Sequence, residues 1–394
     1  MREETSLLGQ FQFLPMEKVV FGAGSLASLP QEVDRLGCRR AMVVTGATLT
    51  KLGLARRIEE ALGERWAGTF SGSRQHAPSH TVFEAIREAR ASGADIIISF
   101  GGGSPIDTGK IVARYVTAEI HSPRDLINLA PGDMTGNTHV ALPQIAIPTT
   151  LSAAEFNAAA GITDEETRVK SVFRDHQMTP RTVILDPELT LATSAQLWAS
   201  TGIKALDHAV EVIYSRHHQP LTDVTGLEAI RLLFNYLPRV MREPDDLEAR
   251  LQCQIAAWFS ILGVTNVRLG LGHAVGHQIG ARCNVPHGLT SCVTLPHVMR
   301  FVTPLATPRL VLMTQAMGVD TGGLSAEAAA AAAADAVEAI IGNLGLPRRL
   351  RDVGVTKDDL HAVAKASFPE AASSNSPRPV TSPEEILQLL LQAW

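Results

Sequence analysis

The chain has 394 residues, of which 45% are hydrophobic, and a formal net charge of -5 at pH 7. This length suffices for two domains, each with its own core. The acidic balance and the lack of a basic block exclude nucleic acid as an expected partner. No apolar run reaches membrane-spanning length. Four cysteines without CxxC spacing predict a reducing cytoplasm rather than a disulfide framework.

Strands and helices alternate in the first half of the sequence. Strands are predicted over 19–24, 41–46, 94–100, 144–150 and 181–187, with helices over 25–36, 48–62 and 81–93. This order predicts a parallel sheet covered by helices. Beyond residue 187 helical periods dominate, over 194–214, 222–238, 246–265 and 325–344. We therefore expect an α/β domain over 1–187 and an all-helical domain over 188–394.

A glycine turn follows the buried strand that contains residues 96–98. Three glycines occupy positions 101–103, Ser104 stands where a helix N-cap is expected, and Pro105 takes the first helical position. A strand, a glycine turn and a helix start place free backbone N–H groups and a positive helix end at one spot. Such a spot suits a diphosphate. Because the triplet is not GxGxxG, a tight turn without a ligand is the alternative.

Histidines gather in two segments, TGIKALDHAVE (201–211) and GLGHAVGHQIGARCNVPHG (270–288). On a helix, His273 and His277 share one face, as do Lys204 and His208, because each pair is four residues apart. His287 follows at a Pro-His-Gly turn. These side chains can converge between helices, either on a divalent metal or as a proton-handling site. The alternative is a set of ordinary buried or surface histidines.

These segments resemble the iron-containing alcohol dehydrogenase superfamily, also called group III. GGGSPIDTGK (101–110) matches its phosphate loop, IPTT (147–150) its second cofactor segment, and the two histidine segments its metal segments. Within the superfamily, residues 76–78, 180–191 and 377–380 resemble the maleylacetate reductase branch. The resemblance covers essentially the whole chain. It implies a Rossmann-like dinucleotide-binding α/β domain, an all-α C-terminal domain, and hydride transfer between a nicotinamide and an alcohol or carbonyl carbon.

The resemblance also implies which residues bind the cofactor. They are Gly101, Gly102, Gly103, Ser104, Asp107, Thr149, Thr150, Lys170 and Gly46. Gly46 stands where many family members carry an aspartate that binds the adenosine ribose and repels a 2′-phosphate. We therefore expect NAD(H) or NADP(H) as the cofactor.

In metal-dependent members of the superfamily, the ligands are one aspartate and three histidines. The histidines correspond to His208, His273 and His287, but Lys204 stands at the aspartate position. An ammonium 4 Å from a cation is repelled by about 4 kcal/mol per unit charge at an effective dielectric near 20. We therefore expect no metal. The alternative is that Lys204 points to solvent.

Three residues are predicted to be catalytic: Lys204, His208 and His277, the last as a proton shuttle. His273, His287 and Arg282 are predicted to contact the substrate. The leading hypothesis is a metal-independent, maleylacetate reductase-like enzyme in which Lys204 replaces the aspartate ligand.

Two other hypotheses stay open at this point. One is a metal-dependent alcohol dehydrogenase with iron or zinc, and the other is an inactive nucleotide-binding relative. In each case we expect a cytoplasmic homodimer, with a small carbonyl or alcohol compound as the partner of an active enzyme.

Overall fold

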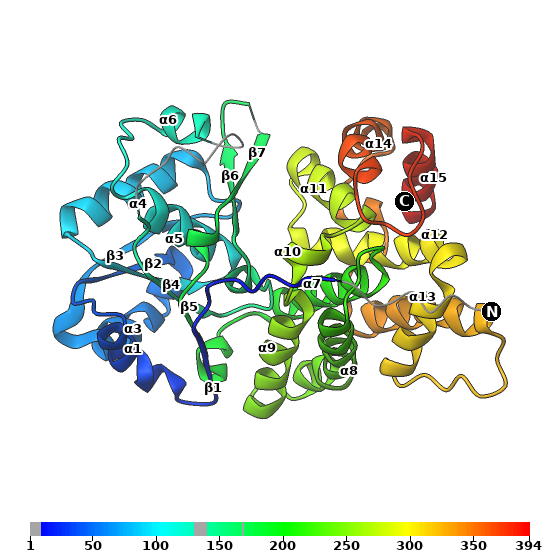
Figure 1. Ribbon diagram of the computed structural model, residues 1–394, viewed down its shortest axis with the longest axis horizontal. Helices are drawn as coiled ribbons and strands as arrows, with labels where there is room; N and C mark the ends of the chain where they lie inside the picture. The colour runs from blue at the N-terminus through cyan, green and yellow to red at the C-terminus, as the bar shows by residue number, and fades with distance from the viewer. Residues whose placement is uncertain (1–8, 130–139, 168) are drawn as a thin grey trace.

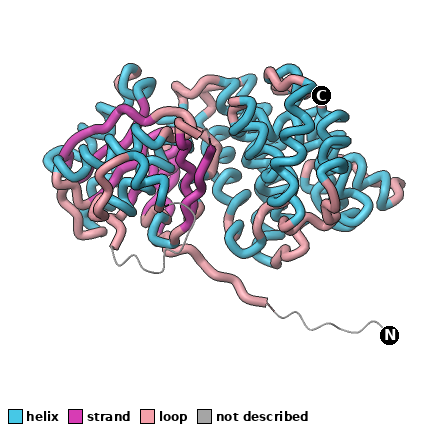
Figure 2. The backbone as a smooth tube through the Cα atoms, turned by 90° about the horizontal axis from the view of Figure 1, so that it is seen from above, coloured by secondary structure: helices cyan, strands magenta, loops and turns pink. Residues whose placement is uncertain are grey.

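The computed structural model describes residues 9–129, 140–167 and 169–394. It has two parts side by side, a sheet with helices around it and a bundle made of helices (Figure 1). Every described strand lies before residue 187, and residues 188–394 contain helices and no strand. Figure 2 shows the strands gathered in one part. The predicted fold class is confirmed, while the division at residue 187 stays a prediction as a domain boundary.

The main sheet has six strands in the order β1-β8-β5-β4-β2-β3, and each neighbouring pair is parallel. In that order the strands are Lys18–Phe21, Thr182–Leu185, Gln144–Pro148, Ile96–Gly101, Ala41–Gly46 and Trp66–Ser73. Successive side chains alternate between the two faces, so both faces carry apolar cores. All carboxyl ends therefore lie at one edge of the sheet.

The helices of the sheet-containing part are α1 (Leu29–Arg35), α2 (Ala47–Lys51), α3 (Leu54–Leu62), α4 (Ser79–Ser92), α5 (Gly103–Tyr115) and α6 (Pro123–Asn128). The single helix predicted over 48–62 is wrong, because Gly53 adopts a φ of 74° between α2 and α3. The sequence analysis also missed β3, which contains two glycines and two serines and so carries a weak strand signal.

A separate antiparallel hairpin was also missed, formed by β6 (Ala159–Asp164) and β7 (Val169–Arg174). It stands apart from the parallel sheet and lies on the side that faces α11 (Figure 1). Residues of this hairpin contact α5, the helix that follows the glycine turn, as described below.

The helical part is built from nine α-helices over residues 188–394, with a short 3-10 helix at Leu350–Val353. They are α7 (Ala195–Tyr214), α8 (Pro220–Arg242), α9 (Leu247–Ile261), α10 (Val264–Val267), α11 (Leu271–Cys283), α12 (His287–Ala316), α13 (Ala326–Asn343), α14 (Lys357–Ala372) and α15 (Pro383–Ala393). The sequence analysis did not predict α12, which has 30 residues and three internal prolines. Prolines normally end helices, so they hide a continuous helix from a reading of the sequence. The apolar core of the helical part also includes Ala146, Val183 and Leu185 of the sheet. Because buried residues of α7 belong to the same core, this packing anchors α7 against the sheet.

No single helix among the described residues is long and apolar enough to cross a membrane. One pair, Leu247–Val267 with Leu271–Cys283, reaches that length and composition together, but it bends by 105° at its break.

Candidate active site

The glycine turn joins β4 to α5 at the carboxyl edge of the sheet. The N-cap prediction for Ser104 is wrong, because Gly102 is extended (φ −81°, ψ −165°) and the helix begins at Gly103. No side chain caps this helix start, so its first backbone N–H groups are left for a ligand. A helix start of this kind is a ready site for an anion.

The segment after β5 closes over the same turn. A Cβ atom at Gly102 would lie 3.2 Å from Thr150 Cγ2, and one at Gly103 would lie 3.3 Å from Ser152 Oγ. Thr150 Oγ1 and Ser152 Oγ are buried and have no hydrogen-bond partner in the described part of the chain. Two unpartnered hydroxyls beside a close-packed glycine turn fit a dinucleotide diphosphate. The backbone N–H of Thr149 donates to Gly101 O at 2.9 Å, which ties this segment to the turn.

Asp107 and Lys170 meet where α5 contacts the hairpin. The N–H of Gly161 donates to Asp107 Oδ2 at 3.1 Å, and the stem of Lys170 lies over Gly161, where a Cβ atom would come within 2.0 Å of Lys170 Cε. Burial raises the pKa of Asp107, although Lys110 and Lys170 act against that rise. Gly46 ends β2 at the same edge of the sheet and starts α2. Their roles toward a cofactor stay predictions.

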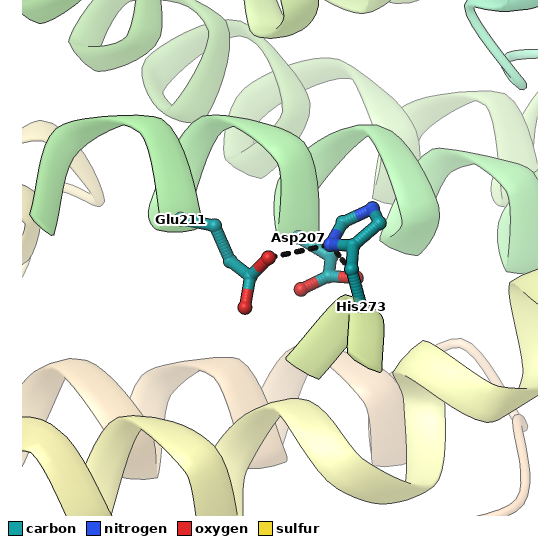
Figure 3. A group of neighbouring side chains, drawn as sticks. All are labelled: Asp207, Glu211 and His273. Carbon is teal, nitrogen blue, oxygen red and sulfur yellow. Dashed lines mark hydrogen bonds and ion pairs between the residues drawn. The ribbon is translucent and has the colours of Figure 1, made fainter. Parts of the chain in front are cut away.

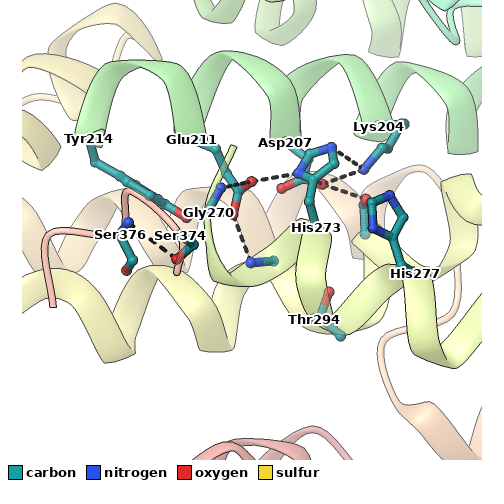
Figure 4. Close-up of polar contacts among 12 residues, drawn as sticks. Lys204, Asp207, Glu211, Tyr214, Gly270, His273, His277, Thr294, Ser374 and Ser376 are labelled. Carbon is teal, nitrogen blue, oxygen red and sulfur yellow. Dashed lines mark hydrogen bonds and ion pairs between the residues drawn. The ribbon is translucent and has the colours of Figure 1, made fainter. Parts of the chain in front are cut away.

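Lys204 lies in the middle of α7 and is only 4% exposed. Its ammonium Nζ lies 2.9 Å from Asp207 Oδ2 and 2.6 Å from His273 Nε2 (Figure 4). The alternative that Lys204 points to solvent is therefore wrong. Burial opposes ionisation of Asp207, but Lys204, His273 and the hydrogen bond from Ser291 together outweigh it and hold the pKa of that carboxyl well below its usual range. Ser291 Oγ donates to the same carboxylate at 2.7 Å.

Glu211 fixes the orientation of His273 (Figure 3). Its carboxylate accepts from the N–H groups of Gly270 and Gly272 at 2.9 and 2.7 Å, from Tyr214 OH at 2.7 Å, and from His273 Nδ1 at 2.5 Å. A carboxylate only accepts, so we assign the proton of His273 to Nδ1. His273 Nε2 is then the acceptor for the Lys204 ammonium.

The predicted histidines come together around Lys204. The ring centroids of His208 and His273 are 5.1 Å apart, those of His273 and His287 6.1 Å, and those of His277 and His287 5.4 Å. Burial, helped by the nearby Lys204 ammonium, holds the pKa values of His208 and His287 well below their usual range. Both rings are therefore neutral.

The donor set around Lys204 does not fit a divalent metal. Atoms of Asp207, Glu211 and His273 lie within 4.8 Å of one another, which brings enough potential ligands together. However, both Glu211 oxygens already accept hydrogen bonds, and the Lys204 ammonium occupies His273 Nε2. A cation at this point would compete with a positive charge that is already there.

Arg282 lies at the end of α11 and faces α14. Its Nε is 3.5 Å from Asp359 Oδ1, and its side chain is 53% exposed. The Asp359 carboxylate balances the positive charge of the Arg282 guanidinium. That Arg282 contacts the substrate stays a prediction.

The sequence analysis missed four polar residues of the site: Asp207, Glu211, Ser291 and Glu370. The first two follow Lys204 by three and seven residues, a helical spacing that places all three on one face of α7. That signal was available in the sequence. Ser291 and Glu370 come from other helices, and no local pattern connects them to Lys204.

Comparisons with known proteins agree with this architecture. Residues 16–187 match the profile "Iron-containing alcohol dehydrogenase", and residues 198–394 match "Fe-containing alcohol dehydrogenase family, C-terminal". The chain belongs to the iron-containing alcohol dehydrogenase family. The structure of a 1,3-propanediol oxidoreductase has a TM-score of 0.92 and 30% identity, over 98% of this chain and 100% of that one.

Three curated relatives match this chain over nearly its full length. Lactaldehyde reductase of Escherichia coli is 34% identical over 96% of this chain and 98% of its own. The NAD-dependent methanol dehydrogenase of Bacillus methanolicus is 30% identical over 97% and 99%. A maleylacetate reductase of Pseudomonas sp. is 32% identical over 96% and 95%. The chain is therefore a nicotinamide-dependent oxidoreductase of alcohol or carbonyl groups, close to the maleylacetate reductase branch.

Proposed function

We propose that this enzyme reduces a small carbonyl substrate without metal, as a maleylacetate reductase-like enzyme in which Lys204 takes the place of the metal. A bound nicotinamide supplies the hydride. The observation that carries the proposal is the position of Lys204 Nζ, 2.6 Å from His273 Nε2, the ring nitrogen that faces into the cluster.

The Lys204 ammonium has three N–H donors. Asp207 Oδ2 and His273 Nε2 take two of them, which leaves one for a substrate oxygen. A carbonyl that accepts hydride develops negative charge on its oxygen, and a fixed cation aimed at that oxygen lowers the barrier. Asp207 and His273 hold the cation in place, so little reorganisation is needed at the moment of reaction.

The product alcohol also needs one proton on its oxygen. Lys204 can donate it directly, with a histidine as the relay that restores the proton. His277 suits this role better than His208, because its side chain is 34% exposed while His208 is buried. A relay has to exchange protons with solvent.

The residue at the end of β2 supports acceptance of both NADH and NADPH. Gly46 offers no carboxylate against a 2′-phosphate. We also propose that the protein is a cytoplasmic homodimer with domains over residues 1–187 and 188–394.

A metal-dependent alcohol dehydrogenase is the second candidate. The observation that favours it is the closeness of Asp207, Glu211 and His273. Metal binding at these residues would require the Lys204 ammonium to move away from His273 Nε2. The two hydrogen bonds of Lys204 oppose that movement.

Replacement of Lys204 tests the proposed role. In Lys204→Met, turnover of small aldehydes and keto acids should fall by roughly 100- to 1000-fold, the usual loss for one such donor. The variant also leaves Asp207 as an uncompensated buried charge, which costs about 3–5 kcal/mol of stability. Steady-state kinetics and urea unfolding measure the two effects, and nicotinamide binding should not change.

A double variant separates chemistry from stability. Lys204→Met with Asp207→Asn removes both charges, so stability should recover while turnover stays low. Lys365→Met, an exposed lysine on α14, is the matched control. Wild-type turnover in the double variant would contradict the role given to Lys204.

A further inference from the structure

His277 meets a carboxylate from a distant part of the sequence. Its Nδ1 lies 3.0 Å from Glu370 Oε1 and 3.2 Å from Oε2. His277 belongs to α11 and Glu370 to α14, two helices that pack against each other. The hydrogen bond from His277 lowers the pKa of the Glu370 carboxyl against the effect of burial. An ionised carboxylate only accepts hydrogen bonds, so the His277 proton belongs on Nδ1.

A second contact fixes the plane of the same ring. The rings of His277 and His287 stack with centroids 5.4 Å apart and only 7° between their planes. Glu370 determines which edge of His277 faces α14, and His287 determines the tilt. Nε2, on the opposite edge, makes no hydrogen bond to any residue that the structure describes. His277 also shares a helix face with His273, the acceptor of the Lys204 hydrogen bond.

We propose that Glu370 is a positioning residue that keeps the proton of His277 on Nδ1 and leaves Nε2 free to exchange a proton with the reacting site. This inference rests on the proposed carbonyl reduction. As the substrate oxygen takes a proton from Lys204, Nε2 of the neutral Nδ1–H ring accepts one proton from solvent. His277 passes this proton on, which restores the Lys204 ammonium and returns the ring to its neutral Nδ1–H form. Without Glu370, the neutral ring also adopts the Nε2–H form, which cannot accept at that edge.

Two substitutions and one control test the inference. Glu370→Gln keeps the size of the side chain but offers both a donor and an acceptor to Nδ1. Its kcat should fall by about 10- to 100-fold, on the scale of the loss seen when a partner that orients a metal-bound histidine is removed. KM for the cofactor should stay unchanged. Glu370→Asp should recover part of the rate, and Asp358→Asn, an exposed carboxylate on the same helix, should have no effect.

A spectroscopic measurement separates positioning from a structural role. Protein labelled with nitrogen-15 in its 13 histidines reports the protonated ring nitrogen by NMR at about pH 8, above the ordinary histidine pKa. The signal lost in His277→Asn identifies His277. We expect the Nδ1–H form in the wild type and a mixture of tautomers in Glu370→Gln. An unchanged tautomer in Glu370→Gln, or unchanged kcat, would overturn the inference. If the wild type turns over no carbonyl substrate, the proposed function fails, and the spectrum alone decides whether Glu370 sets the tautomer.

Discussion

Lys110 and Lys204 are both buried lysines, one in α5, which follows the glycine turn, and the other at the centre of the histidine cluster. Lys110 Nζ lies 2.5 to 2.9 Å from four acceptors, namely Ala154 O, Asn157 O, Asn157 Oδ1 and Ala159 O. Among the residues that the structure describes, Lys204 has two hydrogen-bond partners, and both are ionisable side chains. Burial alone therefore does not identify a functional lysine. In the proposed mechanism, Lys204 differs by having one N–H donor left for substrate, whereas the bonds of Lys110 hold the segment that faces the glycine turn.

The glycine turn at the start of α5 allows the largest test of this contrast. In Gly102→Val, the added side chain would fill the space between the turn and Thr150, where a single Cβ atom already comes within 3.2 Å. We expect nicotinamide binding to be lost in a fluorescence titration, because the backbone can no longer approach the diphosphate. Thermal unfolding should show that the variant still folds. Unchanged affinity for NADH would show that the cofactor does not use this turn.

The charge balance around Lys110 gives a pH-dependent test. Burial raises the pKa of Glu155 to about 7, and burial lowers that of Lys110 to about 8. Because the folded Glu155 carboxyl holds its proton more tightly than the unfolded one, its contribution is full below about pH 4.5 and is lost as pH rises through about 7. The loss amounts to up to about 3 kcal/mol.

The measurement compares the wild type with Glu155→Gln by urea unfolding from about pH 5 to pH 7.5. The free energy of unfolding of the wild type should fall across this range relative to that of the variant. Parallel curves for the two proteins would mean that Glu155 is not the source of the pH dependence, and that the buried charges beneath the turn are balanced in another way.

The smallest expected effect concerns cofactor choice at Gly46. Gly46→Asp places a carboxylate near the site expected for the 2′-phosphate, and two unit charges 4 Å apart in water repel by about 1 kcal/mol. NADPH should therefore lose about fivefold in kcat/KM relative to NADH, because about 1.4 kcal/mol corresponds to one factor of ten. If the wild type already rejects NADPH by orders of magnitude, a residue other than Gly46 sets the preference.

Local patterns predicted more of the glycine turn than of the histidine cluster. The strand, the glycines and the following helix are adjacent in sequence, so they could be predicted, apart from the cap wrongly assigned to Ser104. The shared faces of His273 with His277 and of Lys204 with His208 followed from helical spacing. Glu370 and Ser291 could not be predicted, because only the packing of α11, α12 and α14 brings them to the cluster. The pairing of Lys204 with Asp207 could have been inferred from their spacing of three residues.

Metal content tests the central claim most directly. Freshly purified wild-type protein should contain iron or zinc far below one equivalent and should turn over equally well with and without a chelator, because Lys204 provides the positive charge. Lys204→Asp should instead combine one carboxylate with three histidines and bind zinc or ferrous iron, which makes it the positive comparison for elemental analysis. One equivalent of metal in the wild type, with activity that a chelator removes and added metal restores, would contradict the account.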